Sequence, residues 1–156
     1  MNSNITWLEE KIFHRPLTDD EKHILEELLQ TQHFNKGDII IEEGQAADGL
    51  FILASGAVAL EHQKHGQSVR LANLEAGSQL GDMSSFNGEP ASATAKALEA
   101  SEVYHFPQAS IQYMMEHSQG LSRDIMLNTI RNLGKAVRQM NDSQALTQQY
   151  IQGMSK

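Results

Sequence analysis

The chain contains no cysteine. That absence excludes disulfide bonds, zinc–thiolate sites, cysteine-ligated iron–sulfur clusters and thiol nucleophiles. No apolar run approaches the length of about 18 residues that a membrane-spanning helix needs. Residues 1–10 also lack the basic start and the long apolar stretch of a secretory signal. We therefore expect a soluble, cytoplasmic protein.

Positive charge is scarce. Twelve Lys and Arg residues stand against 20 Asp and Glu, which gives a formal net charge of −8 over 156 residues. A compact acidic domain repels phosphate backbones, so the charge disfavours general nucleic-acid binding. The length is that of one domain with an appended helix, enough to bury roughly 70% of the surface exposed by the unfolded chain.

Residues 1–31 are expected to form a helical segment. Thr18-Asp19-Asp20-Glu21 has the residues of a capping box, and an apolar stripe follows it, which predicts a helix at about Thr18–Gln30. The middle of the chain, residues 32–107, consists of short apolar runs separated by glycine turns every 8–12 residues. This spacing of short apolar runs and turns predicts an all-β roll or barrel.

Residues 108–156 return to a helical period, with a short helix at about Gln108–His117 and a longer one at about Leu121–Gln152. The longer helix carries apolar residues at alternating steps of four and three, as in a heptad repeat. Such a seam favours a homodimer through this helix, and the alternative is a single helix lying across the roll. The predicted dimer residues are Met126, Ile130, Leu133, Val137 and Met140.

One pattern in the β-rich region is specific. It reads Phe34-x-x-Gly37-Asp38-x-Ile40-x-x-Glu43-Gly44-x-x-Ala47-Asp48-x-x-Phe51-Ile52-Leu53-x-x-Gly56-x-Val58. It closely resembles the cyclic nucleotide-binding domain family, which includes catabolite-activator and fumarate–nitrate-regulator sensor domains, kinase regulatory subunits and the tails of gated channels. The resemblance covers about residues 10–140. It implies a mainly β fold with flanking helices, namely a β-roll of the jelly-roll type plus a long C-terminal helix.

The family's function lies in a phosphate-binding cassette, which aligns with residues 80–94. In the family a Gly-Glu pair opens a short helix, and an Arg-Ser-Ala sequence follows after a glycine-containing loop. The resemblance implies that the glutamate binds the ribose 2′-hydroxyl and that the arginine binds the cyclic phosphate. Here Asp82 stands at the glutamate position and Ala91 at the arginine position. The residues predicted to bind ligand are Gly81, Asp82, Met83, Ser84, Ala91, Ser92 and Ala93.

The missing arginine predicts weak, altered or lost binding of cyclic nucleotides. A hydrogen bond to a charged group contributes about 1.5–3 kcal/mol, so its loss lowers affinity by about two orders of magnitude. The sequence leaves two ligand classes open, namely a cyclic nucleotide or another small anion. Lys96 and Arg138 are the candidate replacement cations, and their ordinary interpretations are an exposed strand lysine and a solvated helix face.

No catalytic or metal-binding arrangement stands out. His62 and His65 with Glu61 lack the His-x-His spacing of a cupin metal centre, and Ser84-Ser85 lacks a nucleophile elbow. No helix-turn-helix follows the long helix before Lys156, so we expect no direct DNA binding. The sequence predicts a non-enzymatic, stand-alone sensor module that has a possible regulatory protein partner. The alternatives are a protein–protein scaffold without a small ligand, or the regulatory domain of a larger signalling or transcription system.

Overall fold

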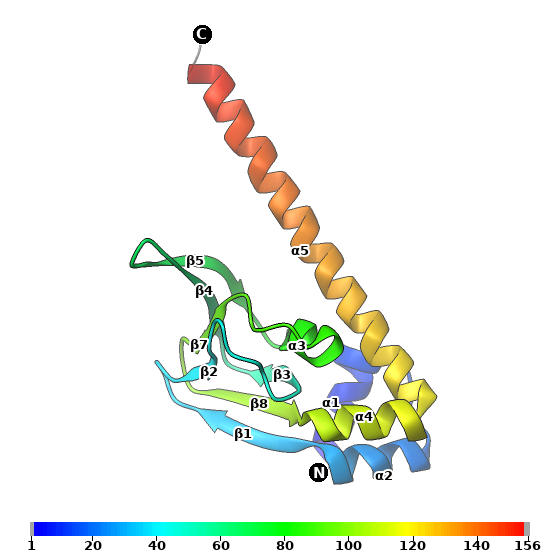
Figure 1. The fold of residues 1–156 in the computed structure, drawn as a ribbon. Helices are drawn as coiled ribbons and strands as arrows, with labels where there is room; N and C mark the ends of the chain where they lie inside the picture. Colours follow the sequence, from blue (N-terminus) through cyan, green and yellow to red (C-terminus); the bar gives the residue numbers. More distant parts are fainter. Residues whose placement is uncertain (1, 155–156) are drawn as a thin grey trace.

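The computed structural model describes residues 2–154, with the side chains of residues 2, 3, 82, 83, 140 and 143–154 left aside. Short helices precede a β-rich region, and a pair of helices follows it (Figure 1). The helices are α1 (Asn2–Leu8), the π-helical η1 (Glu9–Phe13), α2 (Asp19–Leu28), α3 (Asp82–Asn87), α4 (Gln108–His117) and α5 (Gln119–Met154). The strands are β1 (Gln30–Phe34), β2 (Ile39–Ile41), β3 (Leu50–Ser55), β4 (Val58–Lys64), β5 (Gln67–Leu74), β6 (Gln79–Leu80), β7 (Thr94–Ala97) and β8 (Ser101–Phe106).

The strands form two antiparallel four-stranded sheets, ordered β1-β8-β3-β6 and β2-β7-β4-β5. Together they make a β-roll. Helices α1, α2 and α4 lie at one end of the roll, and α5 begins beside them and runs on beyond the strands (Figure 1). The expected mainly β fold, a roll with a long C-terminal helix, is confirmed.

Strand β3 separates two hydrophobic cores. Phe51 and Leu53 pack inside the roll with residues such as Val58. Leu50 and Ile52 point the other way and pack against the helices. Side chains alternate between the faces of a strand, so a continuous apolar run fills both cores at once. This arrangement attaches the helices firmly to the roll.

Helix α2 starts where the sequence predicts but ends earlier. Thr18 caps α2 in a capping box, in which its hydroxyl accepts from Glu21 N and the Glu21 carboxylate accepts from Thr18 N. Helix α2 ends at Leu28, whereas the capping and stripe predicted a helix to Gln30. The chain turns at that point because residues 30–34 pair with β8 as strand β1.

Candidate functional site

A cavity of about 120 Å3 opens between the roll and the segment that follows β6. Five of the seven predicted ligand-binding residues line it. The side chains of the other two, Asp82 and Met83, lie outside the described residues. The lining residues are Ile41, Leu60, Gln79, Leu80, Gly81, Ser84, Ala91, Ser92, Ala93 and Ala95. The segment identified from the sequence therefore surrounds a single hollow.

The backbone at the start of the cassette requires glycine. Gly81 has φ +77°, and a Cβ there would lie 2.6 Å from the carbonyl oxygen of Gly49. Residues with side chains rarely adopt this conformation, and the contact leaves no space for one. Ser85 N and Oγ both donate to the carbonyl oxygen of Gly81, at 3.0 and 2.8 Å. These bonds hold the first turn of α3 against the cavity.

The main chain of Ala91 is fixed by the turn after β2. Gly44 N donates to Ala91 O, and Ala91 N donates to Gln45 O, each at 2.9 Å. Neither bond involves the Ala91 side chain, which is partly buried against the core of the roll. The wall at residue 91 is therefore a defined surface that ends at a methyl group.

Glu43 anchors the turn that holds Ala91. Its backbone N donates to Thr94 Oγ1 at 3.0 Å. Its carboxylate accepts from Gln63 N at 3.1 Å and forms a second hydrogen bond with His62 Nδ1. The bond from Gln63 N, followed by the neighbouring His62, lowers the pKa of Glu43 below its ordinary value. The cavity rim is thus tied to β4.

None of the described side chains that line the cavity carries a charge. Ala95 lines the wall and is 1% exposed, so Lys96, the next residue along β7, points to the opposite face of the sheet. Arg138 lies on an exposed part of α5. Neither candidate replacement cation lines the cavity.

Sequence reasoning missed a polar contact behind the cavity. The buried side chain of Gln79 reaches α5, where its Nε2 donates to Thr129 Oγ1 at 2.7 Å and its Oε1 accepts from Asn128 Nδ2. Both α5 residues are buried. A signal existed in the sequence, because Asn128 and Thr129 occupy the helix face on which Leu121 and Ile125 are apolar.

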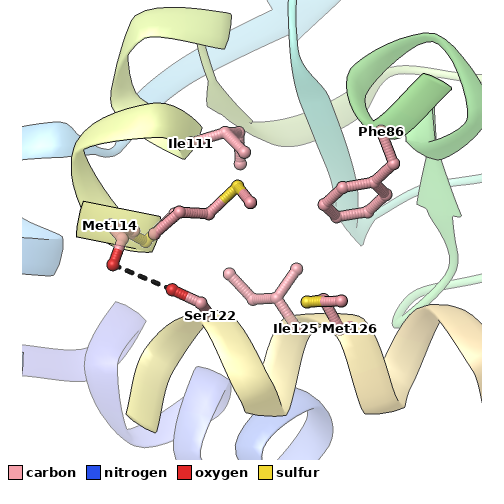
Figure 2. Close-up of a pocket in the computed structure, with 7 residues that line it drawn as sticks. Phe86, Ile111, Met114, Ser122, Ile125 and Met126 are labelled. Carbon is pink, nitrogen blue, oxygen red and sulfur yellow. Dashed lines mark hydrogen bonds between the residues drawn. The ribbon is translucent and has the colours of Figure 1, made fainter. Parts of the chain in front are cut away.

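A second hollow lies where α3 meets the last two helices. Phe86 from α3 faces Ile111 and Met114 of α4 and Ile125 and Met126 of α5 (Figure 2). Its volume is about 10 Å3, which is about the space of one water molecule. It is therefore a small gap in the packing between α3 and the pair formed by α4 and α5.

The histidines and carboxylates of the described residues are dispersed. Within residues 2–154, the described side chains include no group of three or more His, Asp or Glu that could hold a metal ion. His62 instead forms its hydrogen bond with Glu43. Among the described helices, none is both long enough and apolar enough to cross a membrane.

Comparisons with known proteins all match one domain family. The model of the cyclic nucleotide-binding domain family matches residues 31–118. The cAMP-dependent protein kinase regulatory subunit of Mucor circinelloides is 26% identical over 91 residues, which cover 58% of this chain and 21% of that protein. The chain spans between 8% and 21% of the length of four curated relatives that it matches.

Solved structures share the fold. A cyclic nucleotide-binding domain from Methylobacillus flagellatus has a TM-score of 0.81 at 17% identity, covering 91% of this chain and 83% of that one. The Thermus thermophilus catabolite activator protein has a TM-score of 0.69 at 24% identity, covering 88% and 63%. A regulatory subunit of a cAMP-independent protein kinase A from Trypanosoma cruzi, bound to guanosine, has a TM-score of 0.65 at 20% identity, covering 74% and 41%.

Proposed function

Because the chain belongs to the cyclic nucleotide-binding domain family, we propose that it is a regulatory module whose cassette accepts an uncharged nucleoside in place of a cyclic nucleotide. The observation that carries this proposal is the cavity wall at Ala91, which ends at a methyl group with no cation among the described lining side chains. The family's arginine would occupy this position.

The physical argument concerns the phosphate. A cyclic phosphate that leaves water needs a charged or multiply hydrogen-bonded partner, and a buried unpaired charge is strongly unfavourable. A nucleoside carries no phosphate, so it needs no cation in the cavity. The hydroxyl of Ser84 donates to Glu89 O at 2.5 Å and can still accept from a ligand, and Ser92 adds a second hydroxyl, so the lining suits a neutral polar ligand. The Trypanosoma cruzi regulatory subunit supports the idea, because a chain that contains this fold is bound to guanosine in its structure.

Isothermal titration calorimetry with guanosine, adenosine, cyclic AMP and cyclic GMP tests this specificity. We expect a nucleoside to bind at least about tenfold more tightly than its cyclic nucleotide, a difference of about 1.4 kcal/mol. Native mass spectrometry of the purified protein should show whether a nucleoside is already bound. Micromolar or tighter binding of a cyclic nucleotide, or no binding of either nucleoside, contradicts the proposal.

A ligand in the cavity would change the packing of α4 and α5 through α3. Phe86 of α3 lines the small hollow that α3 shares with α4 and α5 (Figure 2). Gln108, the first residue of α4, donates from Nε2 to Ser85 O at 3.0 Å. A ligand that binds one arrangement of α3 more tightly than another shifts the packing of these helices by its difference in affinity. The output of the module is therefore the position of α5.

We also propose that α5 pairs with α5 of a second copy. Four residues of the predicted seam are described, and all are exposed. The exposed fractions are 46% for Met126, 62% for Ile130, 41% for Leu133 and 54% for Val137. The side chain of Met140 lies outside the described residues. β-Branched residues at 130 and 137 alternate with Met126 and Leu133, the pattern that favours two parallel strands in a coiled coil.

The residues that flank the seam permit close approach. Leu127, Gly134, Thr129 and Ala136 occupy the flanking positions, and none is charged. The basic residues Arg131, Lys135 and Arg138 fall on the outer positions of the heptad. A parallel pair would therefore bring no like charges together at its interface.

Ile130→Asp should convert a dimer into a monomer. The substitution places a carboxylate in the centre of an apolar interface, where its desolvation is not compensated. Sedimentation velocity or light scattering coupled to size-exclusion chromatography measures the mass. Lys135→Asp introduces the same side chain on an outer position and should leave the dimer intact. A wild-type protein that remains monomeric at high micromolar concentration argues against pairing.

A further inference from the structure

We propose that Gln79 couples the ligand cavity to the long helix α5. The inference rests on the proposed nucleoside function for the identity of the ligand, but the contact itself does not. Gln79 belongs to β6, lines the cavity and is only 8% exposed. It is therefore a positioning residue that touches both the binding site and the output helix.

The amide of Gln79 uses one N–H and one oxygen lone pair in bonds to α5. Its Nε2 donates to Thr129 Oγ1 at 2.7 Å, and its Oε1 accepts from Asn128 Nδ2. Thr129 Oγ1 donates in turn to Ile125 O at 2.9 Å. The α5 partners, Asn128 and Thr129, are 6% and 7% exposed. One orientation of a single side chain on the cavity wall thus holds this turn of α5 through two directional bonds.

The same face of α5 carries a buried polar group that no described residue pairs with. Asn132 lies one helical turn beyond Asn128, and its Nδ2 is buried without a hydrogen-bond partner among the described residues. Buried donors are nearly always paired, and an unpaired one is unfavourable. The described part of α5 therefore holds one unpaired buried donor a helical turn from the bonds to Gln79.

The chemistry of Gln79 indicates which ligands can change the contact. A carboxamide pairs with an edge that offers one donor beside one acceptor. The Watson–Crick edges of guanine and adenine both offer such a pair. A base that turns the carboxamide of Gln79 toward the cavity breaks its bonds with Asn128 and Thr129, so ligand binding weakens the hold of the roll on α5. By linkage, a partner that fixes α5 changes ligand affinity by the same factor.

Hydrogen exchange of the α5 backbone amides at residues 125–132 tests the proposal. Gln79→Leu keeps the approximate volume and removes both bonds to α5. We expect exchange in this segment to rise by about tenfold, the factor equivalent to about 1.4 kcal/mol. Gln32→Leu is the matched control, because Gln32 donates from Nε2 to His105 Nδ1 at 3.1 Å on β8. It should leave exchange at residues 125–132 unchanged.

Asn128→Leu removes the contact from the helix side and should raise exchange in the same segment. This variant decides the question if Gln79→Leu does not fold. Saturating guanosine should raise exchange at residues 125–132 in the wild-type protein and produce no further rise in Gln79→Leu. That loss of response distinguishes coupling from a merely structural role, which would leave the response to ligand intact.

The outcomes separate this inference from the proposed function. Unchanged exchange in Gln79→Leu and Asn128→Leu, or an equal rise in Gln32→Leu, overturns the contact as a specific link. Guanosine that binds by calorimetry but leaves exchange in the wild type unchanged overturns the coupling. Absence of nucleoside binding overturns the proposed ligand, while the ligand-free comparison of the glutamine variants still decides whether Gln79 holds α5.

Discussion

Replacing Ala91 with arginine should raise the affinity for cyclic AMP by about two orders of magnitude or more, because it supplies a charge-assisted bond of about 1.5–3 kcal/mol or stronger. The backbone at this position is already held on both sides, by Gly44 N and Gln45 O. The new side chain therefore extends from a fixed point on the cavity wall. Calorimetric titration with cyclic AMP and cyclic GMP measures the gain.

Ala91→Met is the matched control for this substitution. Methionine fills the same direction with a flexible, uncharged chain, so it should give no gain for either cyclic nucleotide. Guanosine affinity should not rise in Ala91→Arg, since the nucleoside has no phosphate for the guanidinium to bind. An unchanged affinity for cyclic nucleotides in Ala91→Arg means that the cavity has lost more than the charge.

Arg15→Met should destabilise the protein by about 3 kcal/mol at neutral pH, the cost of leaving a poorly exposed carboxylate without its cation. Arg15 lies just after η1 and binds Glu21 of α2 and Asp124 of α5, with closest distances of 2.6 Å to each. The two carboxylate side chains are only 13% and 9% exposed. Methionine retains the apolar stem and removes the charge. Chemical denaturation followed by circular dichroism measures the free energy of unfolding.

Arg123→Met provides the comparison. Arg123 Nε lies 3.5 Å from the other oxygen of Asp124, but its side chain is 66% exposed. Exposed ion pairs contribute about 0–1 kcal/mol, so this substitution should change stability little. Equal effects of the two substitutions would show that Arg15 does not anchor α5 to the N-terminal helices.

The Arg15 effect depends on pH in a defined direction. The hydrogen bond from Arg15 lowers the pKa of Glu21 from 4.5 to about 2. A lowered carboxyl pKa contributes stability that is fully present above the unfolded-state value and is lost as pH falls toward the folded-state value. The stability difference between wild type and Arg15→Met should therefore be constant above about pH 5 and shrink between pH 4.5 and 2.

The sequence predicted the roll because its signals are local. Apolar runs between glycine turns predict strands without reference to distant residues, and the Thr18 capping box starts α2 where expected. Strand β1 gave no such signal. Its sequence, Gln30–Phe34, is mostly polar and becomes a strand through pairing with β8. The stretch at Glu9–Phe13 likewise has no pattern that distinguishes its π-helix from an α-helix.

The candidate site was predictable in outline only. Motif spacing predicted that Ala91 and Ser92 belong to one site, and both line the cavity. The sequence shows that Asn128 and Thr129 lie on the apolar face of α5, but it does not show that they pair with Gln79, which is 49 and 50 residues away. Which polar side chains pair over such a distance depends on how α5 packs against the roll, and no short sequence motif predicts that packing.

The pairing of Ala91 with Gly44 and Gln45 has a consequence for how such proteins diversify. Both hydrogen bonds use main-chain atoms alone. Any residue other than proline at position 91 keeps them, so side chains can be exchanged there while folding is preserved. Ligand charge preference and scaffold stability then change independently, and a lineage could gain or lose response to an anionic messenger in one amino-acid step.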